Sequence, residues 1–273
     1  MQDNFNLDDI QQQVLDFMRS LGIETDILCL KLDGEIHRFA TRDDKLGQKS
    51  GAYCIHSEGW PAGFVQDWRK GIKENWKFNI AGLDQAQRSY FTSDEFRKKC
   101  EEEERKAEEK RKAVHSAASE QARILWETLK PAPDNHPYLV RKNVRSYLLG
   151  IHPDTGDLAV PLENIHGQVV SIQWIPVDKN KPKLFFKNAS LEGSFFSIDL
   201  FTIDKTYDGI ILLGEGYATM AKIYELTGYP CAAAMSCHRL REITEILHST
   251  FPKSKIIIMA DNDLATEVKT GKN

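Results

Sequence analysis

Acidic residues follow two apolar runs in the last third of the chain. Glu215 comes directly after IILLG (210–214), and Asp261 and Asp263 come directly after KIIIMA (255–260). Continuous apolar runs of this kind are typical of buried parallel strands. Parallel strands bring their carboxyl ends to one edge of a sheet, which is where ligands of open α/β sheets bind. We therefore expect the three carboxylates to converge.

Three converging carboxylates repel one another unless a cation lies among them. Mg²⁺, or Mn²⁺ in its place, fits this requirement, because it prefers oxygen ligands and is commonly shared between carboxylates and phosphates. Gly214 and Gly216 are expected to leave room beside Glu215 for a phosphate or for a backbone to approach closely. A metal held in this way supports formation or cleavage of a phosphodiester. A lone Glu after a strand is commonly a surface residue and a lone Asp-x-Asp commonly a turn, so it is their combination that favours a metal site.

The elements around these residues predict an α/β core over 206–273. Helix-like segments at 217–226 and 239–248 alternate with the apolar runs and with a short strand, CAAAM (231–235). Strands that alternate with helices indicate a parallel sheet with helices on its faces. A preceding subdomain, 134–205, is rich in short strands, which we expect at LAVPL (158–162), VVSIQWI (169–175), KLFF (183–186) and SFFSI (194–198), with a turn at 164–167.

A charged segment, 96–130, separates this region from the first part of the chain. It contains no Gly or Pro, and its acidic and basic residues recur at helical spacings. Ser93 and Asp94 can cap its start, and Pro131 ends it. The pattern predicts a long, solvated linker helix, with a helix that lays its basic residues along DNA as the alternative.

Residues 1–95 predict a small α+β domain. Asp8 to Leu21 has the apolar spacing of an amphipathic helix, and Asp33-Gly34 predicts a hairpin turn. Tryptophans stand among basic residues here, a combination that can bind single-stranded DNA through stacking and phosphate contacts. The competing interpretation is that the tryptophans form the core. The residues concerned are Trp60, Trp68 and Trp76, with Arg38, Arg42, Lys45, Lys49, Arg69, Lys70, Lys73 and Lys77.

IILLGEGYATM and IIIMADND together resemble the topoisomerase–primase (Toprim) domain, in which a strand ending in Glu pairs with a later strand ending in Asp-x-Asp. The upstream segments LAVPLENIHGQVVSIQWI, KPKLFFKNASLEGSFFSI and HPYLVRKNV resemble primases of the phage and plasmid type. The resemblance covers 134–273. It implies an α/β Toprim-type parallel sheet core, preceded by the small α+β domain and the charged linker helix.

The resemblance implies a DNA primase, which makes short RNA primers on single-stranded DNA from nucleoside triphosphates. Glu215, Asp261 and Asp263 would be both its catalytic residues and its metal ligands. Lys183, Lys187, Arg141 and Lys142 would bind nucleotide or nucleic acid, with a solvated strand edge as the alternative for the lysines. The Toprim region, 206–273, looks C-terminally incomplete, which suggests the N-terminal part of a primase with a replicative helicase as partner.

Composition excludes several classes of protein. Hydrophobic residues make up 41% of the 273 residues and the net charge is −4, so any DNA-binding surface must be a local patch. The five cysteines form no CxxC pair, which argues against a zinc ribbon and favours reduced thiols in the cytoplasm. We find no apolar run long enough for a membrane span. Two other functions stay open, a Toprim nuclease that cleaves DNA and a non-catalytic fragment that binds single-stranded DNA.

Overall fold

The computed structural model describes residues 6–27 and 29–260. The chain forms two compact units, Met1–Lys110 and Arg111–Asn273, which we call unit 1 and unit 2. The boundary falls inside the longest helix, α3 (Asp94–Thr128), so each unit contains part of it. We describe each unit by itself.

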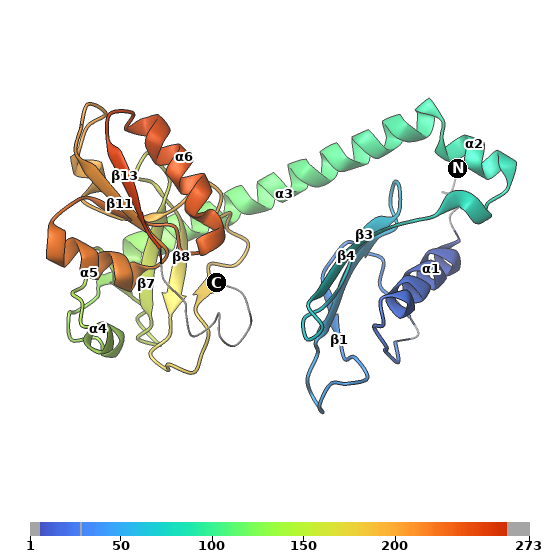
Figure 1. The fold of residues 1–273 in the computed structure, drawn as a ribbon, viewed down its shortest axis with the longest axis horizontal. Helices are drawn as coiled ribbons and strands as arrows, with labels where there is room; N and C mark the ends of the chain where they lie inside the picture. The colour runs from blue at the N-terminus through green and yellow to red at the C-terminus, as the bar shows by residue number, and fades with distance from the viewer. Residues whose placement is uncertain (1–5, 28, 261–273) are drawn as a thin grey trace. The chain divides into compact units, whose positions relative to one another are not determined.

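Unit 1 is a four-stranded antiparallel sheet with a helix on one side (Figure 1). Helix α1 (Leu7–Ser20) begins at Asn6, whose side chain accepts a hydrogen bond from the amide of Asp8. Its apolar stripe packs on the sheet, as its spacing predicts, through Ile10, Val14 and Met18. The strands lie in chain order: β1 (His37–Phe39), β2 (Gly51–His56), β3 (Ala62–Asp67) and β4 (Ile72–Lys77).

The predicted hairpin at Asp33-Gly34 is wrong. The segment before this turn forms no strand, and β1 pairs instead with β2. Asp33 makes only an isolated bridge to His56, and its carboxylate accepts a hydrogen bond from the amide of Glu35. This local side-chain bond supports the turn, and the amide of Gly34 donates to the carbonyl of Ile55 in β2 rather than to a hairpin partner. Asp33-Gly34 therefore forms a turn, but this turn does not connect two paired strands.

An aromatic cluster closes unit 1 at the start of α3. Helix α2 (Gln85–Phe91) begins with a capping box between Asp84 and Gln87. Phe96 of α3 is buried and packs edge-on against Phe91, which also contacts Trp60. The hydroxyl of Ser93 accepts a hydrogen bond from the amide of Phe96, which confirms Ser93 as the cap. A short helix, η1 (Ile80–Gly82), precedes these elements.

The middle of α3 is solvated and its end is packed. Arg105 pairs with Glu102 and Glu109 at helical spacings, as the sequence predicts. Beyond the unit boundary Ala118 and Ala122 are buried, and Ala122 lies in a core cluster with Leu125, Trp126 and residues of strands β7 (Leu158–Glu163) and β8 (Val169–Ile175). The last turns of α3 are therefore part of the unit 2 core rather than a free linker.

The first sheet of unit 2 is a five-stranded antiparallel meander. Its strands are β5 (Lys130–Pro131), β6 (Gly150–Ile151), β7 (Leu158–Glu163), β8 (Val169–Ile175) and β9 (Leu184–Phe185). The predicted turn between β7 and β8 is confirmed by a hydrogen bond from the amide of Gly167 to the carbonyl of Asn164. The predicted opening motif HPYLVRKNV forms a short helix, α4 (Pro137–Lys142).

The second sheet of unit 2 has the predicted parallel strands. Strand β11 (Ile210–Gly214) lies between β12 (Cys231–Ala233) and β13 (Lys255–Met259), parallel to both. β10 (Phe196–Ile198) pairs antiparallel with β12. The order is therefore β10-β12-β11-β13.

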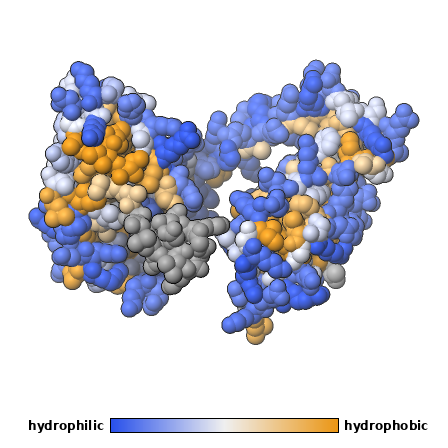
Figure 2. Space-filling view, in the orientation of Figure 1, coloured by the Kyte–Doolittle hydropathy of each residue, from blue (hydrophilic) through white to orange (hydrophobic). Residues whose placement is uncertain are grey.

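Helices cover both faces of this second sheet (Figure 1). Helix α5 (Tyr217–Thr227) packs on the face that carries Leu212, and α6 (Leu240–Thr250) packs on the face that carries Ile211 and Leu213. Helix η3 (Cys237–Arg239) leads into α6, and η2 (Leu200–Thr202) follows β10. Figure 2 shows hydrophobic side chains gathered over β11 and β13, and Ile258 of edge strand β13 is 46% exposed. The α/β organisation predicted for this region is confirmed. Among the described residues no helix combines the length and apolarity that crossing a membrane requires.

Candidate functional site

Three strands of the second sheet end at the same level. Gly214, the last residue of β11, lies opposite Ala233 of β12 and opposite Met259 of β13. Glu215 is the next residue after Gly214, so it lies at the shared carboxyl edge. Asp261 and Asp263 lie outside the described residues, whose last member, Ala260, directly follows β13. Up to that point the register agrees with the expected convergence, and among residues 6–27 and 29–260 no group of three or more potential metal-ligating side chains occurs.

The two glycines beside Glu215 serve different purposes. A Cβ on Gly214 would lie 2.3 Å from the sulfur of Met220 and 3.2 Å from the carbonyl oxygen of Met259. Gly214 therefore allows α5 and the backbone of β13 to approach closely, which is one of the two roles expected of it, and it leaves no room for a phosphate. A Cβ on Gly216 would meet no described residue within 4 Å, so the described part of the chain leaves this side of Glu215 open.

Backbone strain occurs at the same edge. Met235, two residues after β12, has φ of +66°, a left-handed conformation that side chains with a Cβ rarely adopt. The amide of Ala234 donates to the carbonyl of Gly214, which ties this strained segment to the end of β11. Strain of this kind is found preferentially at functional sites.

The first turn of α5 is fixed by a buried tyrosine. The hydroxyl of Tyr217 donates to the carbonyl of Arg145 at 2.7 Å and accepts from the amide of Tyr147 at 3.0 Å. Burial raises the pKa of Tyr217, so the hydroxyl keeps its proton. Glu225, at the other end of α5, accepts a hydrogen bond from the amide of Arg145 at 2.8 Å. Because Tyr217 is two residues after Glu215, these bonds hold the backbone that carries Glu215.

Basic side chains gather around one aromatic ring near Glu215. The ammonium of Lys183 lies 5.6 Å from the centre of the Tyr138 ring, and the guanidinium of Arg141 lies 5.4 Å from it. Lys142 adds a third positive charge close enough to act on the Tyr138 hydroxyl. Partial burial lowers the pKa of Lys183, and the carboxylate of Glu215 opposes this shift. Four of the predicted residues, Glu215, Lys183, Arg141 and Lys142, therefore belong to one neighbourhood, which we call the Tyr138 cluster.

Lys187 lies elsewhere. It lines an open hollow of about 600 Å³ with Phe186, Trp174 and residues of α3 such as Val114 and Ala118. Lys187 and Lys183 therefore have different neighbours, although both belong to the same basic stretch of sequence. Proximity in sequence had suggested a shared role for them.

Sequence reasoning missed two side chains of this region, Tyr138 and Glu163. Tyr138 stands in HPYLVRKNV beside the predicted Arg141. Glu163 ends β7 at a register shift, and in the described part of the chain its carboxylate accepts one hydrogen bond, from the hydroxyl of Ser197 at 3.4 Å. Burial raises the pKa of Glu163 to about 7. A carboxylate that ends an otherwise fully apolar strand, LAVPLE, was the available signal.

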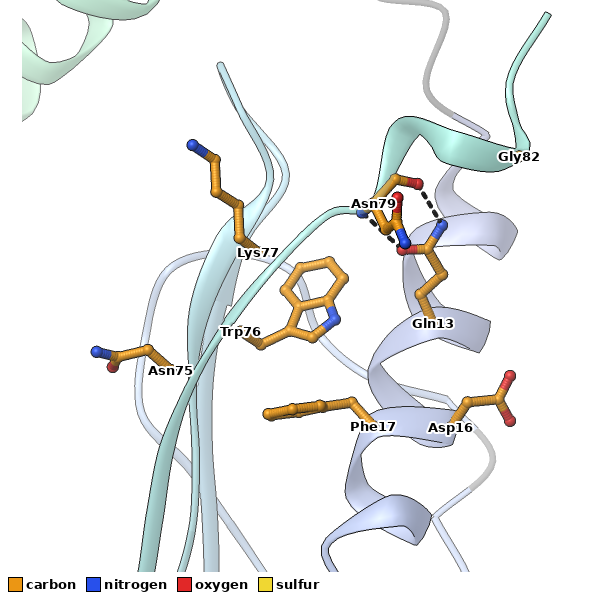
Figure 3. A pocket seen from close by; sticks show the side chains of 8 residues that line it. All are labelled: Gln13, Asp16, Phe17, Asn75, Trp76, Lys77, Asn79 and Gly82. Atoms are coloured by element: carbon orange, nitrogen blue, oxygen red, sulfur yellow. Dashed lines mark hydrogen bonds between the residues drawn. The ribbon is translucent and has the colours of Figure 1, made fainter.

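Unit 1 has a hollow of its own, between α1 and β4 (Figure 3). The side-chain amide of Gln13 bonds both the amide and the carbonyl of Asn79 at 2.9 and 3.0 Å. Trp76 and Phe17 lie below this pair, and Asp16 points away from it (Figure 3). Gln13 thus continues the hydrogen bonding of β4 where the strand ends, which is a structural role.

The sequence is similar to proteins named as DNA primases. The chain is 29% identical over 246 residues, 89% of its length, to a DNA primase TraC of Escherichia coli, and 26% identical over 243 residues to a second DNA primase TraC of that species. The chain spans only 22% and 16% of the lengths of these two relatives. No protein-family model matches.

The solved structures found are more distant. The primase fragment of the bacteriophage T7 primase-helicase aligns with 44% of this chain and 49% of its own, with a TM-score of 0.34 and 18% identity. The primase of Aquifex aeolicus, with its zinc-binding and RNA polymerase domains, aligns with 96% of this chain and 75% of its own, with a TM-score of 0.32 and 13% identity. Both scores are too low to establish a shared fold. The sequence relatives alone therefore confirm the primase resemblance: over most of its length, this chain is similar to two DNA primases named TraC.

Proposed function

We propose that the chain is the catalytic core of a DNA primase, which joins ribonucleotides into a short primer on single-stranded DNA. The observation that carries the proposal is the position of Glu215 and Lys183. A carboxylate at the edge of a parallel sheet and a cation within its electrostatic reach belong to a segment that is similar to named primases. The parallel strands, with Glu after β11 and Asp-x-Asp after β13, support a Toprim-type core.

The donor set suits a divalent metal. Glu215 would hold Mg²⁺ or Mn²⁺ together with Asp261 and Asp263, all of them oxygen donors. When bound, the metal would neutralise charge on the phosphate being transferred. The open side of Gly216 leaves space next to Glu215 that a phosphate can enter.

The chain's own cations would hold the triphosphate. The Lys183 ammonium and the Arg141 guanidinium lie 5.6 and 5.4 Å from the centre of the same Tyr138 ring, and a ring that contacts both limits how far either side chain can move. Positioned cations of this kind orient a phosphate for in-line attack by a primer 3′-hydroxyl. Tyr217 keeps the backbone next to Glu215 in place through its two hydrogen bonds. A replicative helicase as partner rests on the motif resemblance alone.

The test is incorporation of labelled ribonucleotides on circular single-stranded DNA with Mg²⁺. Wild type, Asp261→Asn and the control Glu245→Gln would be compared, since Glu245 is exposed on α6 and paired with Arg241. We expect short labelled products from the wild type and the control, and none from Asp261→Asn. Products from all three would contradict the metal site. Nicking of the template that depends on Asp261 would replace the primase with a nuclease.

A further inference from the structure

The sheet of unit 1 has a second face, opposite α1. Side chains alternate between the two faces of a strand, and the core residues Tyr53, Val65 and Trp76 all point toward α1. The other face carries the residues between them. They include Arg38 of β1, Phe64 of β3 and Lys73 and Lys77 of β4, and Trp68 continues the same alternation just past β3. We call this the open face.

Each cation of the open face lies over an aromatic ring. The guanidinium of Arg38 is 5.9 Å from the centre of the Trp68 ring, and the ammonium of Lys73 is 5.3 Å from that of Phe64. Lys77 is 4.6 Å from the Trp60 ring. Trp68 is 58% exposed, so its ring remains accessible to a further planar group. The open face thus carries three cations that lie over aromatic rings, and one of these rings, that of Trp68, is accessible.

Charge on this face is unbalanced. None of the three cations forms an ion pair with any residue that the structure describes. Other basic residues of unit 1 do form such pairs, as Arg42 does with Glu24 and Arg69 with Asp44. No carboxylate occurs at the open-face positions of β1 to β4, all of which the structure describes. Asp33 and Glu35 are the acidic residues close to this face, at the end near β1, where burial and then their charges raise the pKa of the Cys54 thiol. Asp33 is hydrogen-bonded to the ring of His37. The surface is therefore positive, in a chain whose net charge is −4.

We propose that the open face binds single-stranded DNA, with Trp68 stacking on a base and Arg38, Lys73 and Lys77 contacting phosphates. Unpaired bases supply the planar rings that an exposed tryptophan accepts, and the backbone supplies the negative charge that unpaired cations lack. A duplex hides its base faces, so it would lose the stacking contact. The choice of DNA rests on the proposed function, in which the template is single-stranded DNA.

The three tryptophans of unit 1 differ in burial, which the sequence pattern does not reveal. The sequence places Trp60, Trp68 and Trp76 among basic residues alike. The structure buries Trp76 in the core at 6% exposure, while Trp60 donates its ring N–H to the carbonyl of Phe78 and packs on Phe91. Only Trp68 is free to stack, so the two interpretations of the tryptophans apply to different residues.

The experiment measures binding of the full chain to fluorescent oligo-dT by anisotropy, without Mg²⁺ or nucleotides. We expect Trp68→Ala to weaken binding about 10-fold, and Trp68→Phe, which keeps an aromatic ring, to remain within threefold. Arg38→Ala with Lys73→Ala should lower the slope of log affinity against log salt by roughly 0.7 for each lost phosphate contact. The matched controls Arg19→Ala and Leu7→Ala change exposed residues of α1, on the other side of the sheet, and should bind as the wild type does.

Several outcomes would overturn the proposal. Unchanged binding by the Trp68 and Arg38 variants, with binding lost in Lys183→Ala, would assign the DNA to the Tyr138 cluster instead. Equal affinity for a duplex, or tighter binding of oligo-U than of oligo-dT, would exclude single-stranded DNA as the preferred ligand. Because the assay involves no synthesis, binding that depends on Trp68 without any primer formation would keep this inference and remove the proposed function.

Discussion

The sheet of unit 1 and the second sheet of unit 2 present charged residues in different ways. In unit 2 the described charged residues of the site stand after a parallel strand, as Glu215 does after β11, or on nearby segments, as Lys183 and Arg141 do. In unit 1 they stand on the strands themselves, on one face of an antiparallel sheet. The edge of unit 2 gathers a few side chains around one point, next to Glu215. The open face of unit 1 spreads cations and rings along a surface.

This difference separates two kinds of recognition. A site where a cation lies within the electrostatic reach of a carboxylate, as Lys183 does with Glu215, suits a reaction on one phosphate. A row of rings and cations, such as Trp68 and Arg38, suits a chain of repeating bases and phosphates. The comparison predicts that changes in unit 2 alter chemistry and changes on the open face alter binding.

The largest expected effect comes from Glu215→Gln. The substitution keeps the shape of the side chain and removes its charge, so a bound metal would lose a charged ligand. We expect primer synthesis to fall at least 100-fold, because a metal contributes several kcal/mol to stabilising the charge of the transition state. Binding of oligo-dT should change less than twofold. Loss of binding together with synthesis would break the comparison, since Glu215 would then support the DNA site as well.

Gly63→Ala tests unit 1 by itself. A Cβ at Gly63 would lie 1.9 Å from the carbonyl oxygen of Cys54, a backbone atom of the neighbouring strand. The sheet must shift to accept it, and we expect a loss of about 1 to 3 kcal/mol in the stability of unit 1. Thermal unfolding followed by tryptophan fluorescence measures this loss. At Gly82 an added Cβ would meet nothing within 4 Å, so Gly82→Ala is the control and should unfold near the wild-type temperature.

The sequence predicted the strands of unit 2 better than it predicted the side-chain contacts between them. Apolar runs and the residues after them located β11 and β13, because buried parallel strands have a strong local pattern. The pairing of Lys183 with Tyr138, and the filling of space at Gly214 by Met220, depend on segments far apart in the chain. No local pattern contains that information. Asp261 and Asp263 lie outside the described residues, so their convergence with Glu215 stays a prediction.

In unit 1 the sequence left two features undetermined, the strand partner of one turn and the faces on which the tryptophans lie. The turn at Asp33-Gly34 was misread as a hairpin because the dipeptide identifies a turn without identifying its strand partner. The choice between core and surface for Trp68 and Trp76 follows from strand alternation once the register is known. In the sequence both tryptophans have basic neighbours, so the sequence does not distinguish them. The strand register places them on different faces of the sheet.

Lys183→Ala sharpens the comparison within unit 2. We expect the KM for nucleoside triphosphate to rise about 10-fold with a smaller change in kcat, because a hydrogen bond to a charged phosphate is worth about 1.5 to 3 kcal/mol. Lys187→Ala is the matched control, since Lys187 belongs to the same basic stretch but lines a different hollow. An equal effect of the two substitutions would mean that the stretch acts through charge alone rather than through the Tyr138 cluster.

The smallest effect concerns the stability of unit 2 and its dependence on pH. The pKa of Glu163 is raised to about 7 in the folded chain, so the folded state holds this proton more tightly than the unfolded state, in which a Glu titrates near its ordinary value. The contribution of the protonated group is therefore fully present below about pH 4.3 and is lost as the pH rises through 7. Glu163→Gln, which resembles the protonated form, should match the wild type near pH 4.5 and exceed it at pH 8 by about 1 to 2 kcal/mol, a value reduced for the water that still reaches the carboxylate. Urea unfolding at the two pH values measures the difference, with Glu192→Gln at an exposed position as the control. A variant that is less stable than the wild type at pH 8 would show that the ionised carboxylate has a favourable partner in the folded chain, and Glu163 would then join Glu215 as a charged group that unit 2 maintains for function.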